Sequence, residues 1–188
     1  MVAVQTLTVR VGGDDYHLRA LRDRLEEADP LFGVLWPASM ALAERMAAYP
    51  VAGKRILEAG CGLALPSVVL KKRGADITAT DHHPLVEEFL NLNLEMNGLP
   101  QLPFKRADWT DADLGRFDLI IGADILYEPD HPAQLAAFLE RHAAPGAEIM
   151  IADPGRRQLS QFRKRMAARY PRCTETRFPP RGRLLTFA

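Results

Sequence analysis

The fold of this chain is decided by residues 54–81, which read KRILEAGCGLALPSVVLKKRGADITATD. The apolar run before Gly60 predicts a short buried strand, residues 66–73 predict a helix, and ADITATD predicts a second strand that ends in an acid. Two strands joined by a helix form a parallel, right-handed unit. The glycines at positions 60 and 62 allow the intervening turn to be tight and to approach a ligand closely.

The rest of the chain continues this alternation of helices and strands. A helix is expected at about residues 39–48, and PLVEEFLNLNLEMNG predicts an amphipathic helix closed by Asn97-Gly98. Further strands are expected in PFKRADW, FDLIIGADI and AEIMIADP, with helices in HPAQLAAFLERHAA and RRQLSQFRKRMAARY. The two closing strands, at about residues 173–178 and 183–187, must be antiparallel because their connection is short.

These elements predict one α/β domain with a Rossmann-like, seven-stranded and mostly parallel sheet that carries an antiparallel terminal strand. The opening TLTVRV-GGDD-YHLRAL alternates around a turn and predicts a β-hairpin. We therefore expect a single domain over residues 1–188, with an N-terminal hairpin extension at 1–33 and the Rossmann-like core at 34–188.

Composition and charge narrow the class of protein. The net charge of zero gives no overall field that selects nucleic acid, although residues 1–140 carry 13 basic and 21 acidic groups and residues 141–188 carry 11 and 3. We favour a solvated helix face as the explanation of the basic tail over a nucleic-acid footprint. Two distant cysteines, no signal-peptide core and no long apolar run predict a cytoplasmic protein without membrane contact, and we expect a monomer.

The turn at Gly60 is the expected ligand site, because such sheets bind ligands beyond the carboxyl ends of their strands. Asp81 ends the next strand about 20 residues on, where a carboxylate can accept hydrogen bonds from ribose hydroxyls. The alternative role for Asp81 is a helix N-cap ahead of Pro84. Leu65 occupies the position where a pyrophosphate-binding turn has glycine, so a ligand without phosphates, such as S-adenosylmethionine, fits better.

The sequence resembles the small protein N-methyltransferases of the seven-β-strand S-adenosylmethionine superfamily, in the methyltransferase-like group that contains many protein-lysine methyltransferases. The resemblance covers about residues 34–155. One departure is Ala64, where the group often has a third glycine. Because alanine is small, we expect a slightly tighter loop that still binds the cofactor. The matching motifs are LWPAS (35–39), ILEAGCGLALPS (56–67), GADITATD (74–81), NLNLEMN (91–97), ADW (107–109) and FDLIIGADILYE (117–128).

The resemblance implies that S-adenosylmethionine is the cofactor, with S-adenosylhomocysteine as its product. The glycine turn would face the methionine part, Asp108 and Trp109 the adenine, and Ala123 the sulfonium. Trp36 would pack beside the cofactor, although either tryptophan is open to the alternative of being plain core. The implied cofactor-binding residues are Trp36, Glu58, Gly60, Cys61, Gly62, Asp81, Asp108, Trp109 and Ala123.

Asp124 and Tyr127 are the candidate catalytic residues, since they follow an apolar strand where a substrate would meet the methyl group. A lysine has a solution pKa of ~10.4, so it arrives as a cation and must lose a proton before it attacks. A carboxylate can orient the ammonium, and an aromatic ring can offer a cation-π face. We expect Asp124 to bind and orient while water takes the proton. The alternative is that Asp124 caps a turn and Tyr127 is core. Glu128 is a weaker candidate for attracting a basic substrate.

The predicted function is therefore an N-methyltransferase that acts on a lysine side chain of a protein. A protein arginine or a small-molecule amine stays open as the acceptor, and a non-catalytic module that binds RNA through the basic segment is the alternative of another class. No metal site is expected, because neither the Asp81-His82-His83 run nor the scattered histidines have ligand spacing; the latter are His17, His131 and His142.

Overall fold

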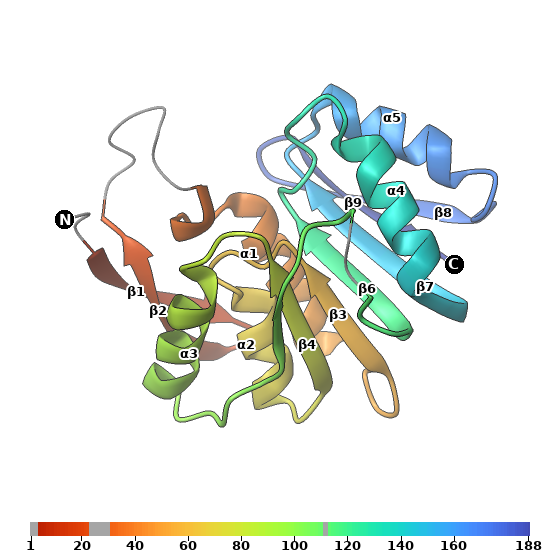
Figure 1. The fold of residues 1–188 in the computed structure, drawn as a ribbon. Coiled ribbons are helices and arrows are strands. Elements are labelled where there is room, and N and C mark those ends of the chain that lie inside the picture. Colours follow the sequence, from red (N-terminus) through yellow and green to blue (C-terminus); the bar gives the residue numbers. More distant parts are fainter. Residues whose placement is uncertain (1–3, 23–30, 111–112) are drawn as a thin grey trace.

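The computed structural model describes residues 4–22, 31–110 and 113–188. Its centre is a seven-stranded sheet in the order β5-β4-β3-β6-β7-β9-β8 (Figure 1). Five strands are parallel, and β9 is antiparallel to both of its neighbours. The strands are β3 (Arg55–Ala59), β4 (Asp76–Asp81), β5 (Phe104–Arg106), β6 (Phe117–Ala123), β7 (Ala143–Asp153), β8 (Cys173–Phe178) and β9 (Gly182–Phe187). The predicted fold class is confirmed.

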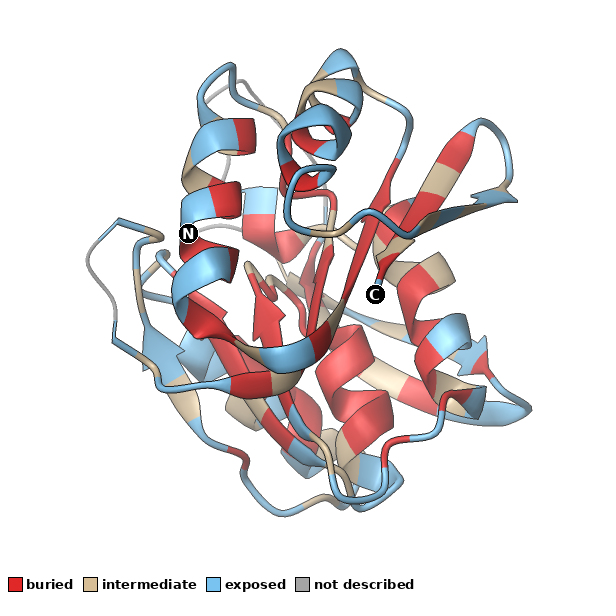
Figure 2. Cartoon of the chain, turned by 90° about the vertical axis from the view of Figure 1, so that its right-hand side faces the viewer, coloured by how far each residue is buried: buried red, intermediate tan, exposed pale blue. Residues whose placement is uncertain are grey.

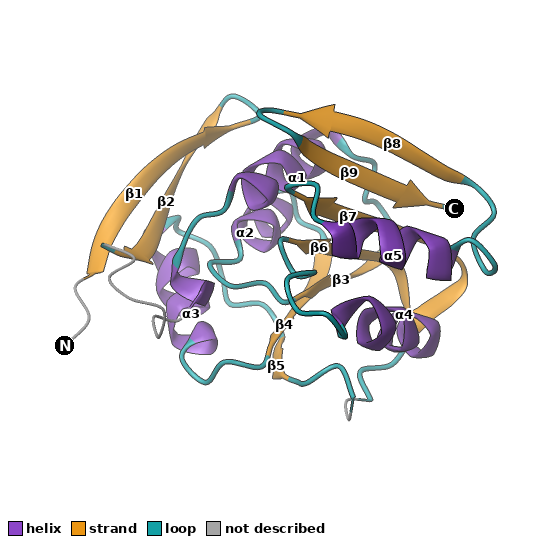
Figure 3. Cartoon of the chain, turned by 90° about the horizontal axis from the view of Figure 1, so that it is seen from above, coloured by secondary structure: helices purple, strands orange, loops and turns teal. Residues whose placement is uncertain are grey.

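Helices cover both faces of this sheet, as the view from above shows (Figure 3). On one face α1, α2 and α3 share a buried cluster with the sheet, and on the other α4 and α5 share a second one. Buried residues lie along the central strands and on parts of each helix, whose other parts are exposed (Figure 2). The helices are α1 (Pro37–Ala48), α2 (Leu65–Lys72), α3 (Val86–Met96), α4 (His131–His142) and α5 (Arg157–Met166), with a short 3-10 helix η1 at Leu31–Gly33. None of the described helices is both long and apolar enough to cross a membrane.

Two strands differ in length from the sequence prediction. The PFKRADW segment forms only the three-residue β5, because an edge strand with exposed Lys105 and Arg106 pairs on one side alone. The strand predicted at AEIMIADP starts earlier, at Ala143, which pairs with Phe117 before the register shifts. Gly146, with φ of 76°, lies in the stretch where the pairing is irregular.

The N-terminal hairpin, β1 (Val4–Val11) and β2 (Asp14–Leu21), forms as predicted and lies beside α3 (Figure 1). Asn93 of α3 and Asn97, which directly follows that helix, bind the free edge of β2. The Asn97 side chain accepts from the backbone N–H of His17 at 3.0 Å and donates to its carbonyl at 2.7 Å. The Asn93 side chain accepts from the backbone N–H of Arg19 at 2.6 Å. Because positions four apart share one helix face, both amides reach the same strand.

Asn93 also reaches the turn that follows β3. Its side-chain amide donates to the carbonyl of Leu63 at 3.0 Å, and the residue is fully buried. One amide therefore joins the hairpin to the glycine turn. This contact gives a physical reason for the asparagine at this position of the NLNLEMN motif.

We predict that Asn93→Ala lowers the free energy of unfolding by about 2–3 kcal/mol, because the N–H of Arg19 and the carbonyl of Leu63 lose their partner. Urea unfolding followed by circular dichroism measures the change. Asn91→Ala, on the same helix, is the control and should change stability by less than about 1 kcal/mol. Equal losses in the two variants would contradict the bridging role of Asn93.

Candidate functional site

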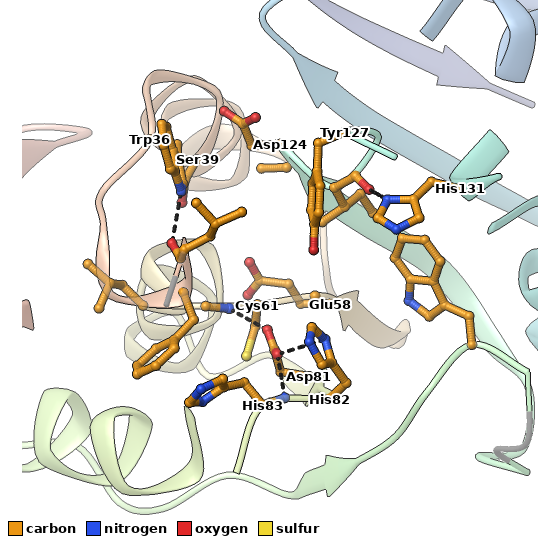
Figure 4. A pocket seen from close by; sticks show the side chains of 18 of the residues that line it. Trp36, Ser39, Glu58, Cys61, Asp81, His82, His83, Asp124, Tyr127 and His131 are labelled. Atoms are coloured by element: carbon orange, nitrogen blue, oxygen red, sulfur yellow. Dashed lines mark hydrogen bonds and ion pairs between the residues drawn. The ribbon is translucent and has the colours of Figure 1, made fainter. Parts of the chain in front are cut away.

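A cavity of about 450 Å³ lies beyond the carboxyl ends of the central strands, next to the Gly60 turn (Figure 4). It is at the place where the strand order reverses, between β3 and β6. All eleven predicted site residues line it: Trp36, Glu58, Gly60, Cys61, Gly62, Asp81, Asp108, Trp109, Ala123, Asp124 and Tyr127. The volume is within the roughly 300–1,000 Å³ range of small-molecule sites.

The turn after β3 has a backbone that side chains would obstruct. Gly60 and Gly62 have φ of 63° and 52°, and a Cβ at Gly60 would lie 2.7 Å from the Cγ2 of Ile125. Ala64 also adopts the left-handed conformation, with φ of 57°, which explains why glycine suits this position in similar proteins. The N–H of Cys61 donates to the carbonyl of Thr80 at 2.9 Å and fixes the turn against β4.

Asp81 holds this turn with its carboxylate. One oxygen accepts from the N–H of Gly62 and the other from the N–H of His83, each at 3.0 Å. The alternative role as N-cap of the next helix is wrong, because α3 begins at Val86 and its N-cap residue is Leu85. Each carboxylate oxygen can accept more than one hydrogen bond, so Asp81 keeps capacity to bind a ligand hydroxyl.

The cavity is acidic. Among the described residues that line it there is no lysine or arginine, whereas five carry carboxyl groups: Glu58, Asp81, Asp108, Asp124 and Glu128. A pyrophosphate would lack a cationic partner here and would be repelled by carboxylates. A positively charged ligand suits this lining.

Glu58 and Cys61 are buried beside Asp81, whereas Asp108 and Glu128 are exposed. Burial changes the pKa of both buried side chains. Burial raises the pKa of Glu58 to about 8, although its carboxyl group accepts hydrogen bonds from the N–H and the hydroxyl of Ser67. Burial, together with the charge of Asp81, raises the pKa of the Cys61 thiol well above its usual value. Cys61 is therefore a neutral wall of the cavity and not a nucleophile.

The candidate acceptor end of the cavity lies around Asp124. This residue follows β6 with φ of 62°, and its N–H donates to the carbonyl of Ala152 at 2.9 Å. Its carboxylate forms an ion pair with Arg156, which also binds Asp153 at 3.1 Å. Burial raises the pKa of Asp124, and the guanidinium of Arg156 opposes that change.

The sequence interpretation left the role of Asp153 unassigned and considered Arg156 only as part of the basic segment, not as a residue of this site. Asp153 is the last residue of β7 and Arg156 follows that strand, and only the parallel pairing of β6 with β7 brings them to Asp124. No local motif signals such a contact, because the residues come from separate loops. Charged side chains after the ends of adjacent strands would be the clue to look for.

The ring of His131 lies close to the rings of both Tyr127 and Trp109. Ring centroids are 4.5 Å apart for Tyr127 and His131 and 5.2 Å apart for Trp109 and His131, all edge to face. The Tyr127 hydroxyl points into the cavity (Figure 4), and the ring is only partly buried, so Tyr127 is not simple core. Trp109 both lines the cavity and packs against the core beneath α4. His131, which the sequence interpretation set aside, is part of the site.

Two aromatic lining residues come from the segment before α1; Trp36 was a predicted cofactor-binding residue, whereas Phe32 had no predicted role. The ring of Phe32, in η1, lies 4.3 Å from that of His83 and 5.2 Å from that of Phe89. Trp36 donates its indole N–H to the carbonyl of Leu31 at 3.1 Å, which holds the start of α1 against η1. Across the described parts of the chain, no three His, Cys, Asp or Glu side chains are grouped to hold a metal ion.

Comparisons with known proteins agree with this architecture. A family model described as lysine methyltransferase matches residues 18–168. The electron transfer flavoprotein beta subunit lysine methyltransferase of Mus musculus is 32% identical over 137 residues, which are 71% of this chain and 54% of that protein. The histone-arginine methyltransferase METTL23 of Xenopus laevis is 31% identical over 104 residues, 50% of this chain and 44% of that protein.

The chain thus spans about half the length of the curated relatives it matches. Among solved structures, the T. thermophilus 16S rRNA N2 G1207 methyltransferase in complex with AdoMet and guanosine superposes with a TM-score of 0.76. That match has 18% sequence identity and covers 100% of this chain and 50% of the other. At this level of identity it establishes a shared fold.

We predict that Glu58 makes stability fall as pH rises. From about pH 4.5 to 8 the folded protein keeps Glu58 protonated while the unfolded chain ionises it, so the folded state binds more protons and loses stability with rising pH. In Glu58→Gln this decline should be smaller by at least about 1 kcal/mol. Urea unfolding at pH 5.5 and pH 8 measures it.

The control for this prediction is Glu95→Gln, which removes an exposed carboxylate of α3 and should leave the decline of the wild type unchanged. If Glu58→Gln and the wild type lose the same free energy of unfolding between the two pH values, the raised pKa of Glu58 is wrong.

Proposed function

This chain belongs to the lysine methyltransferase family, and from that premise we propose that it transfers a methyl group from S-adenosylmethionine to a lysine side chain of a protein. The observation that carries the proposal is the acidic cavity, whose described lining has five carboxyl groups and no lysine or arginine. Both the sulfonium of the cofactor and the ammonium of a lysine are cations, so one acidic cavity suits the two.

The residues present fit this cofactor. Asp81 would accept from the ribose hydroxyls, while Gly60 and Gly62 leave the backbone open to the methionine part. Asp108 and Trp109 line the side proposed for the adenine. When bound, S-adenosylmethionine supplies an electrophilic methyl group on a positively charged sulfur.

The acceptor would be received by Asp124 and Tyr127. The carboxylate orients the incoming ammonium, and the ring and hydroxyl of Tyr127 form one wall of the space that the ammonium occupies. One proton passes from the ammonium to water, and the freed lone pair then forms the N–C bond as the C–S bond breaks toward sulfur. The protein contributes position and electrostatics, which supply most of the rate in such a transfer.

An arginine acceptor is the second candidate, favoured by the similarity to a histone-arginine methyltransferase. A small-molecule amine is the third. The RNA-binding alternative is weakened by the match to the lysine methyltransferase family. In the basic segment Glu175 pairs with Arg163 at 3.2 Å, Arg177 at 3.8 Å and Arg183 at 3.7 Å, and it offsets one of these three positive charges. A cytoplasmic location, a monomeric state and the division at residue 34 stay predictions.

We predict that Asp81→Ala weakens the binding of S-adenosylmethionine at least about 30-fold, because the variant loses both the proposed ribose contact and the bond that holds Gly62. Isothermal calorimetry measures the affinity. Asp76→Ala, at the exposed start of the same strand, is the matched control and should bind as the wild type does. Unchanged affinity in Asp81→Ala would refute the assignment.

We predict that Asp124→Asn retains the affinity for S-adenosylmethionine but lowers methyl transfer at least about 100-fold. Asparagine tolerates the left-handed backbone of this position, so the loop keeps its shape while the charge is lost. The assay uses tritiated cofactor with a cell extract, followed by separation of proteins from small molecules and hydrolysis to identify the methylated amino acid.

Asp130→Asn, an exposed acid just before α4, is the control for Asp124→Asn. Label in methyl-lysine supports the proposal, label in methyl-arginine or in a small molecule selects one of the alternatives, and full activity of Asp124→Asn contradicts the role of that carboxylate.

A further inference from the structure

Three charged side chains meet at the acceptor end of the cavity. Asp124 and Asp153 both bind the guanidinium of Arg156, and both carboxylates are buried while Arg156 is partly exposed. Two negative charges and one positive charge leave the cluster with a net charge of −1, one positive charge short of neutrality. Since buried charges are stable only when they are paired, the cluster is suited to receive one more cation.

The cluster is rigidly held. One oxygen of Asp153 accepts from the N–H groups of Gly155 and Arg156, each at 2.7 Å, and so fixes the loop that starts α5. The other oxygen binds the guanidinium of Arg156. The side chain of Gln158 donates to the carbonyl of Tyr127 at 3.4 Å and joins the same loop to the acceptor segment.

Building on the proposed function, we propose that Arg156 is a positioning residue, which holds the Asp124 carboxylate at the acceptor end and offsets its charge so that a bound lysine can lose its proton. A carboxylate without a partner would orient the ammonium but also stabilise it as a cation, which opposes deprotonation. With Arg156 in place the carboxylate still accepts hydrogen bonds from the amine, while the negative potential that retains the proton is smaller.

The charge balance of transfer follows from this arrangement. The incoming ammonium completes a cluster of two anions and two cations. Once the ammonium has given a proton to water, Arg156 still compensates Asp124, so the neutral amine is not left beside an unpaired buried carboxylate. The lone pair of the nitrogen is then free to form the bond to the methyl carbon.

Other groups near the cluster stay constant in this comparison. Arg183, on the neighbouring β9, is engaged with Glu175. The remaining titratable groups that line the same cavity and could act on the amine include Glu58, Asp81, Tyr127, Glu128 and His131. Because no variant at position 156 alters these side chains, a change in pH dependence reports on the loss of the Arg156 charge, which acts on the amine and on the carboxylate of Asp124 that it contacts.

The test measures kcat and KM for methyl transfer between pH 6 and 10, with the protein that wild-type enzyme labels in the cell extract as the purified acceptor. Arg156→Gln and Arg156→Met remove the charge, and Arg156→Lys keeps it. We expect the rising limb of kcat against pH to move up by about one unit in the two neutral variants and to stay in place in Arg156→Lys. The KM for the acceptor should not rise in Arg156→Gln.

Arg157→Gln, the exposed neighbour at the start of α5, is the matched control and should match the wild type at every pH. A lower kcat with an unmoved limb in both neutral variants would mean a merely structural role and would overturn the inference. Equal shifts in Arg156→Lys and the neutral variants would overturn it as well, because charge would not be the cause.

A measurement without turnover separates this inference from the proposed function. In a double-mutant cycle with Asp124→Asn and Arg156→Gln, urea unfolding should give a coupling that differs clearly from zero. Absence of coupling removes the ion pair on which the inference stands, even if the enzyme labels a protein lysine. If the cycle shows clear coupling but the wild-type enzyme labels no acceptor, the ion pair exists and the proposed function has failed, and the inference fails with it.

Discussion

The carboxylate of Asp81 is the constraint on which the site depends. It accepts the N–H of Gly62 from the turn after β3 and the N–H of His83 from the loop after β4, and so fixes two adjacent loops at one edge of the sheet. The left-handed glycines make the turn possible, but a turn without side chains has little to hold it in place. One buried acid therefore shapes the wall of the cavity and also supplies part of its negative charge.

Carboxyl groups in such a cavity repel one another when they are charged. The protein limits this repulsion in different ways at the two ends of the cavity. Near the glycine turn, burial raises the pKa of Glu58, which removes a charge. At the acceptor end, Arg156 pairs with Asp124 and Asp153, which compensates charge without removing it. The first solution leaves a neutral wall behind the proposed cofactor, and the second leaves a charged group that can bind an amine.

The sequence was sufficient for the mostly parallel seven-stranded sheet, for the hairpin and for the eleven residues predicted to line the cavity, because glycine turns and strand-terminal acids carry local signals. It was not sufficient for the partners of those residues. Arg156 meets Asp124 only through strand pairing, and His131 is recognised as a site residue only because helix α4 places its ring against those of Trp109 and Tyr127. The role of Asp81 as a helix cap failed because α3 begins further along the chain.

Because the hairpin is attached through alternate residues of β2, its length can change only by an even number of residues without breaking these contacts. The backbone N–H groups of His17 and Arg19 point away from β1 toward Asn97 and Asn93, while the intervening residue faces β1. Inserting or deleting one residue before them would turn these donors toward β1 and release Asn93 from the strand. Among homologous chains, length changes in this hairpin should therefore come in pairs of residues.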